Sequence, residues 1–95
     1  RFAQLLSTLG RQSFEQEKYE QSLEYWKRLL QRDNCSEEAY IGCFLAQQAL
    51  GRPGEAVRTY HRCAQVLRKE LGLGPPPQLV EMYLKLSGDT RPQSC

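Results

Sequence analysis

The chain has 95 residues, of which 40% are hydrophobic and 25% charged, and its formal net charge is +2. These values are ordinary for one small globular domain. The mean hydropathy of −0.63 and the lack of a long apolar run exclude a membrane-spanning helix. The weak positive charge does not by itself indicate nucleic-acid binding.

The first two predicted helices span residues 2–16 and 19–32, where apolar residues recur every three or four positions. Each has one apolar stripe, which is typical of a helix that packs on one face. The stripes consist of Phe2, Leu5, Leu6, Leu9 and Ser13 in the first helix and Leu23, Trp26, Leu29 and Leu30 in the second.

The third predicted helix, residues 37–50, is apolar around most of its circumference, so we expect neighbours on more than one side. Asn34 and Ser36 both offer an N-cap, and the spacing of Asn34 and Glu37 resembles a capping box. Gly51 then provides a stop, and Pro53 fits the first turn of the next helix.

The fourth helix is predicted over residues 53–71, with an apolar stripe that ends at Leu71. Gly72 and Gly74 end this helix, and the three prolines that follow force an extended connection. A short fifth helix is predicted over residues 78–86. We therefore expect one domain over residues 1–87 and a flexible tail over 88–95, which has nothing to bury.

The helices contain an internal repeat of 34 residues, which is the tetratricopeptide period. This shift places Ser22 on Ala56 and Trp26 on Tyr60, so a small residue is followed four positions later by an aromatic one. The small residue lets two helices cross closely, and the aromatic ring fills the core beside it. The predicted fold is all-α, with two tetratricopeptide-like hairpins and a C-terminal capping helix. The alternative is a generic helical bundle with a coincidental match.

The residues that carry metal or redox chemistry do not form a recognisable pattern. The cysteines lack a Cys-x-x-Cys pair, and His61 gives no zinc-ligand set with them. Disulfides are possible in number, but a helix-rich chain without a secretion signal suggests a reducing cytoplasm. We expect no cofactor and no metal, with buried or incidental thiols at Cys35, Cys43, Cys63 and Cys95.

Catalytic residues are equally scarce, so the sequence predicts a protein that is not an enzyme. The aspartates, Asp33 and Asp89, lie in predicted turn and tail segments. His61 lies among arginines on the expected outer side of the fourth helix, and the glycines near its end lead into prolines instead of a phosphate-binding helix.

Two surfaces are candidates for binding. Arg58, Arg62 and Lys69 form a basic stripe on the fourth helix, which suggests phosphate contacts or simply a solvated face. The first and third helices of a tetratricopeptide array line its concave side, which predicts a partner groove with an apolar centre. Alternatively, the fifth helix covers that centre. The groove residues are Gln4, Ser7, Arg11, Phe14, Glu38, Ile41, Leu45 and Gln48.

Three segments resemble the bacterial transcriptional activator domain, a module that follows a winged helix in activators of the Streptomyces antibiotic regulatory protein type. They are Asp33–Tyr40, Gly51-Arg52-x-x-Glu55-Ala56-x-x-x-Tyr60-x-x-Cys63, and Leu67-x-x-Glu70-Leu71-Gly72-Leu73-x-Pro75. The resemblance covers residues 2–86, and its most specific part is Glu70–Pro75. Asn34 replaces the proline that usually closes a tetratricopeptide unit.

The resemblance implies a regulatory, protein-binding module of a cytoplasmic transcription activator. Its partners would be its own winged helix, another regulatory domain or RNA polymerase, and self-association is possible. The chain begins at Arg1 without an initiator methionine or a winged helix, so we expect a longer protein in which DNA binding lies upstream. The alternatives are a stand-alone tetratricopeptide adaptor and an accessory domain that contacts nucleic acid through the basic stripe.

Overall fold

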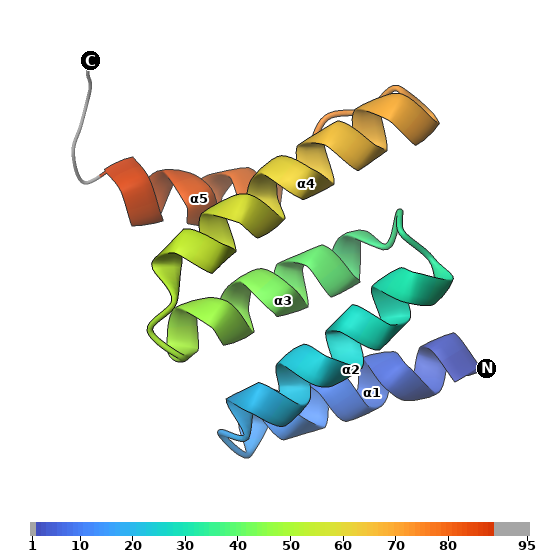
Figure 1. The fold of residues 1–95 in the computed structure, drawn as a ribbon, viewed down its shortest axis with the longest axis vertical. Coiled ribbons are helices and arrows are strands. Elements are labelled where there is room, and N and C mark those ends of the chain that lie inside the picture. Colours follow the sequence, from blue (N-terminus) through green and yellow to red (C-terminus); the bar gives the residue numbers. More distant parts are fainter. Residues whose placement is uncertain (1, 89–95) are drawn as a thin grey trace.

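The computed structural model describes residues 2–88, and this part of the chain folds into helices without any strand. The helices form two consecutive hairpins, α1–α2 and α3–α4, and α5 packs against α3 and α4 (Figure 1). The predicted all-α, tetratricopeptide-like fold is confirmed. The helices are α1 (Phe2–Glu15), α2 (Tyr19–Arg32), α3 (Glu37–Ala49), α4 (Pro53–Leu71) and α5 (Pro77–Gly88).

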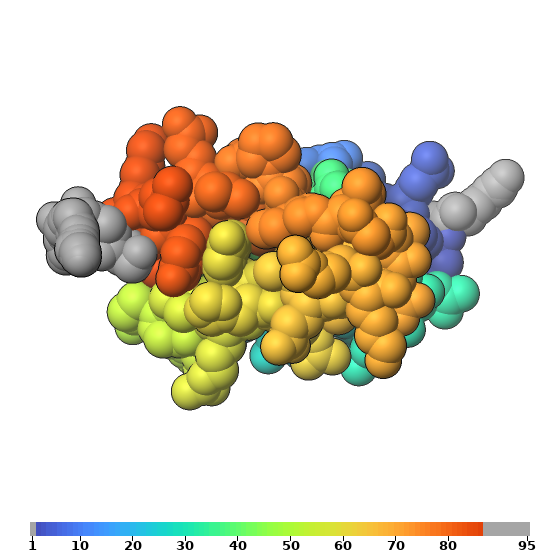
Figure 2. All heavy atoms as spheres, turned by 90° about the horizontal axis from the view of Figure 1, so that it is seen from above, coloured from blue at the N-terminus to red at the C-terminus, as the bar shows by residue number. Residues whose placement is uncertain are grey.

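The helix α3 lies in the middle of the molecule and contacts each of the other four described helices. Its apolar circumference is thereby used on every side, as the sequence predicted. Seen from the end that α4 and α5 form, α5 lies along one side of α4 (Figure 2). It therefore acts as the capping helix of the second hairpin.

The turns that close the two hairpins repeat each other at the same spacing of 34 residues. In the first turn, the Lys18 amide donates to Ser13 O at 2.8 Å, and Glu17 has a left-handed φ of 63°. In the second, the Arg52 amide donates to Gln47 O at 2.9 Å, and Gly51 has a φ of 74°. The backbone hydrogen bonds thus show the same repeat as the side chains.

The N-terminus of α3 differs from the sequence prediction. Ser36 is the N-cap, and its hydroxyl accepts a hydrogen bond from the Ala39 amide at 3.2 Å. The predicted capping box with Asn34 and Glu37 was wrong, because Asn34 lies two residues too early to reach the free amides of the first turn. Its carbonyl oxygen instead accepts a hydrogen bond from the Tyr40 hydroxyl at 2.7 Å.

The ends of the last two helices follow the predicted glycine and proline signals. Gly72 has a φ of 69°, and the Leu73 amide beyond it donates to Leu67 O at 3.2 Å, which closes α4. The helix α5 begins one residue earlier than predicted and runs to Gly88, so the first residue of the predicted tail is helical. Residues 89–95 lie outside the described part of the chain.

The core has two clusters, one on each side of α3. The first joins α1, α2 and α3 around Trp26, and the second joins α3, α4 and α5 around Phe44. Three residues of the predicted stripes lie at the surface instead: Phe2, Leu5 and Leu71 are about half exposed. They lie at helix ends, beyond the neighbouring helices, and the Arg32 guanidinium covers the ring of Phe2 at 4.6 Å.

The aromatic residues of the two repeats, expected from the sequence to share a core role, are placed differently. Trp26 is only 3% exposed, and its ring lies against the backbones of Gly10 and Gly42. Tyr60 is half-buried and stacks on Tyr83 of α5, with ring centroids 4.0 Å apart. The repeat therefore preserves the helix arrangement more closely than the side-chain packing.

Candidate partner-binding groove

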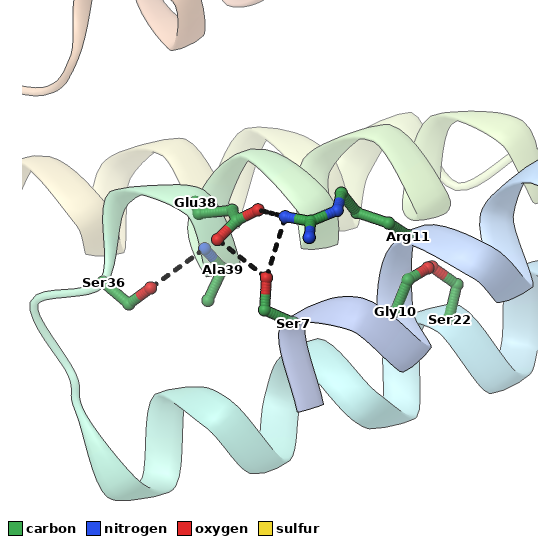
Figure 3. A network of polar contacts seen from close by, with 7 residues as sticks. All are labelled: Ser7, Gly10, Arg11, Ser22, Ser36, Glu38 and Ala39. Atoms are coloured by element: carbon green, nitrogen blue, oxygen red, sulfur yellow. Dashed lines mark hydrogen bonds and ion pairs between the residues drawn. The ribbon is translucent and has the colours of Figure 1, made fainter. Parts of the chain in front are cut away.

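A polar network joins α1 to α3 at one end of the predicted groove (Figure 3). The Ser7 hydroxyl donates to Glu38 Oε1 at 2.8 Å, and Arg11 Nη1 donates to Ser7 Oγ at 3.0 Å. Arg11 also forms an ion pair with Glu38. The side chains of this pair are 56% and 48% exposed, so the pair contributes less than about 1 kcal/mol to stability. Its stronger effect is to fix two opposite charges at the edge of the groove.

An apolar hollow of about 450 Å³ continues from this network along α3. Ile41 and Leu45 form its apolar wall, and a smaller hollow of about 150 Å³ extends past Leu45 to Phe14 on α1. The Trp26 ring and Gly42 form the floor of both. We call these two hollows and the polar network beside them the α1–α3 groove.

The remaining predicted groove residues lie at the two ends. Gln4 lines a third, more polar hollow of about 490 Å³ together with Ser7, Arg11 and Glu38. Gln48 is exposed on α3 and does not line these three hollows. The structure therefore brings seven of the eight predicted residues onto one continuous concave surface between α1 and α3.

The fifth helix borders the groove and leaves it open. Gln78, in the first turn of α5, lines the same hollow as Ile41 and Leu45. Ile41 packs partly against the second core cluster, yet both it and Leu45 remain half exposed to solvent. The alternative in which α5 covers these residues thus holds only for part of the Ile41 side chain.

Two glycines that the sequence prediction missed shape the floor of the groove. A Cβ at Gly42 would lie 2.2 Å from Trp26 Cε2, and a Cβ at Gly10 would lie 2.6 Å from the same atom. Only glycine lets α1 and α3 approach the indole this closely. Ser22 adds to the same close contact, since its buried hydroxyl donates to Gly10 O at 2.7 Å. A glycine inside a helix costs roughly 1 kcal/mol relative to alanine, which is a sequence signal for such a contact.

The basic stripe lies on a different surface. Arg58, Arg62 and Lys69 are exposed on α4, and none of them forms an ion pair within the described residues. His61 is also exposed, and its ring lies edge-on to Tyr60 and Tyr83 with centroids 5.4 and 5.7 Å away. No aromatic side chain alternates with the three cations to form a base-stacking surface.

The described thiols are structural in character. Burial raises the pKa of Cys43 to about 12 and that of Cys63 to about 11, so both stay protonated and weakly nucleophilic at neutral pH. Burial and then the negative charges of Glu70 and Asp33 also raise the pKa of Cys35. Within residues 2–88, no group of three or more His, Cys, Asp or Glu side chains is arranged to hold a metal ion.

These features define a small helical-repeat module with a concave surface between its first and third helices. The model of the bacterial transcriptional activator domain matches residues 1–87, and the chain belongs to that family. Comparisons with curated proteins and with solved structures gave no match. None of the helices within residues 2–88 combines the length and the hydropathy that crossing a membrane requires.

Proposed function

We propose that this chain is a protein-interaction module of a bacterial transcriptional activator, that it acts in the cytoplasm and that it has no enzyme chemistry of its own. The family supports a role in transcriptional activation. The α1–α3 groove supports the interaction role most directly, because its apolar wall stays open to solvent beside an ordered pair of charges. Surfaces that combine these features are typical of sites that bind other proteins.

The groove fits an amphipathic segment of a partner protein. Apolar side chains of that segment would contact Phe14, Ile41 and Leu45 and carry most of the affinity. Arg11 and Glu38 would fix its direction through charge complementarity. The partners that we propose are the winged-helix or another regulatory domain of the same activator, RNA polymerase, or a second copy of the chain.

Reversal of the charges in the groove tests this proposal. We expect the double variant Arg11→Glu, Glu38→Arg to bind the winged-helix domain of the full-length activator or RNA polymerase at least about tenfold more weakly by calorimetry. The matched control reverses Glu24 and Arg28, an exposed ion pair on α2 at 3.5 Å. A folded groove variant that binds both proteins as tightly as the wild type would rule out the groove as the interaction site.

The exposed cations of α4 support a second, weaker candidate function, which is nonspecific contact with DNA phosphates. Arg58, Arg62 and Lys69 lack carboxylate partners within the described residues, but nothing beside them reads base edges. We expect a Kd of about 10⁻⁴–10⁻⁶ M for duplex DNA at physiological salt, equal for unrelated sequences. Sequence-selective binding below the micromolar range in a fluorescence anisotropy titration would contradict this expectation.

A further inference from the structure

A second concave site lies between α2, α3 and α4, away from the α1–α3 groove. It is a pocket of about 280 Å³, which is close to the lower limit for small-molecule sites. We call it the α2–α4 pocket. Its lining residues are Lys27, Leu30, Gln31 and Asn34 from α2 and the turn after it, Tyr40, Cys43 and Gln47 from α3, and Thr59 and Arg62 from α4.

The α2–α4 pocket and the groove use opposite faces of α3. Tyr40, Cys43 and Gln47 follow helical spacings of three and four, so they form one stripe along the helix. The groove residues Ile41 and Leu45 form a second stripe about half a turn away around the same helix. A molecule in the pocket and a partner in the groove would therefore not compete for the same side chains.

The charges in the pocket are all positive. Lys27 and Arg62 come from α2 and α4, on the two sides of α3, and no carboxylate lines the pocket. Neither cation forms an ion pair with a carboxylate within residues 2–88. Burial raises the pKa values of both Tyr40 and Cys43, while the nearby charges of Arg62 and Lys27 act in the opposite direction. The phenol and the thiol stay neutral at pH 7, so they cannot balance the two cations.

A buried amide orders the donors at the wall of the pocket. Gln47 is only 5% exposed, and its nitrogen donates to the carbonyl oxygens of Cys43 and Glu55 at 3.2 and 3.3 Å. Only this orientation of the amide gives both carbonyls a donor. The same nitrogen lies 2.7 Å from Thr59 Oγ1, which accepts its hydrogen bond. The Thr59 hydroxyl proton is then available to a ligand in the pocket.

We propose that the α2–α4 pocket binds a small organic anion through its phosphate or carboxylate group. The anionic oxygens would lie between Lys27 and Arg62, where the guanidinium provides two parallel donors and the ammonium a point charge. The Thr59 hydroxyl and the amides of Gln31 and Asn34 provide neutral donors around them. This inference is independent of the protein-interaction role of the groove.

Titration with small anions tests the proposal. The probes are inorganic phosphate, glucose 6-phosphate and succinate, each added at constant ionic strength and followed by NMR shifts of the backbone amides of Gln47 and Thr59. We expect saturable shifts with at least one probe, with a Kd of about 1 mM or tighter. A response to the phosphates alone identifies a phosphate site, and a response to succinate alone identifies a carboxylate site.

Charge-removing variants separate a built pocket from a general attraction of anions. Lys27→Gln and Arg62→Gln should each weaken binding at least about tenfold, since each removes one charge-assisted contact. The control Arg58→Gln removes an equal charge from the same face of α4 without touching the pocket. We expect its affinity to stay within about twofold of the wild type. Both pocket positions are exposed, so circular dichroism should show unchanged folding.

Three results would overturn the proposal. The first is the absence of saturation with every probe up to about 50 mM, which leaves no affinity of biological use. The second is an equal loss of binding in Lys27→Gln, Arg62→Gln and Arg58→Gln, which indicates charge attraction without a site. The third is binding of an acidic peptide to the pocket while every small probe fails, since the occupant would then be a protein.

Discussion

The two halves of the molecule share one backbone pattern and differ in how they bury their aromatic residue. In the first half, Trp26 lies against the backbones of Gly10 and Gly42 and is almost completely buried. In the second half, a shift of 34 residues places Phe44 and Pro76 where the first half has the two glycines. These residues fill the space that a second buried ring would need.

Tyr60 consequently has a different environment from Trp26. It remains half exposed and obtains its main ring contact from Tyr83 of the capping helix. The comparison teaches that the repeat fixes where helices lie, whereas the residues on the neighbouring helices decide what fills the space between them. It also explains why the groove lies at the first half, because the glycines hold α1, α3 and the indole together as one surface.

The largest expected effect distinguishes the two aromatic residues. Trp26→Ala should lower the free energy of unfolding by about 3–5 kcal/mol, because it leaves a large cavity between three helices. Tyr60→Ala should lower it by roughly 1–2 kcal/mol, since its ring is half-buried and loses fewer contacts. Urea unfolding followed by circular dichroism measures both. Equal losses would mean that the two rings contribute alike and that the comparison fails.

The next effect concerns the glycines beneath the indole. Gly42→Ala should destabilise the protein by about 2–3 kcal/mol, because the new Cβ would overlap the Trp26 ring. The control is Gly54→Ala on α4, where a Cβ meets nothing within 4 Å. That variant should be neutral or gain up to about 1 kcal/mol from higher helix propensity. In a Trp26→Ala background the cost of Gly42→Ala should disappear, and a cost that persists would place its origin elsewhere.

A smaller effect is expected at the helix crossing of the second hairpin. Ala56, the repeat equivalent of Ser22, is completely buried. Ala56→Leu should therefore cost about 1–3 kcal/mol through overpacking. Gln65→Leu introduces the same side chain at an exposed position of α4 and should change stability by less than about 0.5 kcal/mol. If thermal unfolding shows the same stability for both variants, α3 and α4 do not cross closely at Ala56.

Local signals explain why the helix ends could be predicted from the sequence to within two residues. Gly51 and Gly72 end helices because both adopt a left-handed φ, and Pro53 begins one because its fixed φ suits the first turn. The groove residues could be predicted because the repeat places α1 and α3 side by side. Spacing alone then selects the faces that meet, as the contact of Ser7 and Arg11 with Glu38 illustrates.

Features that depend on contacts between distant segments could not be predicted in this way. The Trp26 contact joins residues of three helices, and no periodicity links Gly10 to Gly42. The α2–α4 pocket likewise needs the tertiary position of Gln47, which reads in the sequence as an ordinary polar residue at the end of a helix. The N-cap of α3 was ambiguous because Asn34 and Ser36 are both good caps, and the path of the turn decides between them.

The smallest expected effect compares the two hairpin turns directly. Both turns need a left-handed residue, but the first has Glu17 where the second has Gly51. A side chain in this conformation costs roughly 1–2 kcal/mol, part of which is offset because glycine is more flexible in the unfolded chain. Glu17→Gly should therefore raise the free energy of unfolding by about 0.5–1 kcal/mol. Gly51→Glu should lower it by a similar amount, since the same strain is introduced and a Cβ there meets no other atom within 4 Å. Urea midpoints of the two variants and of the double exchange, which should be close to the wild type, test whether the turns are equivalent. Shifts of the same sign in both single variants would show that the two turns are not interchangeable.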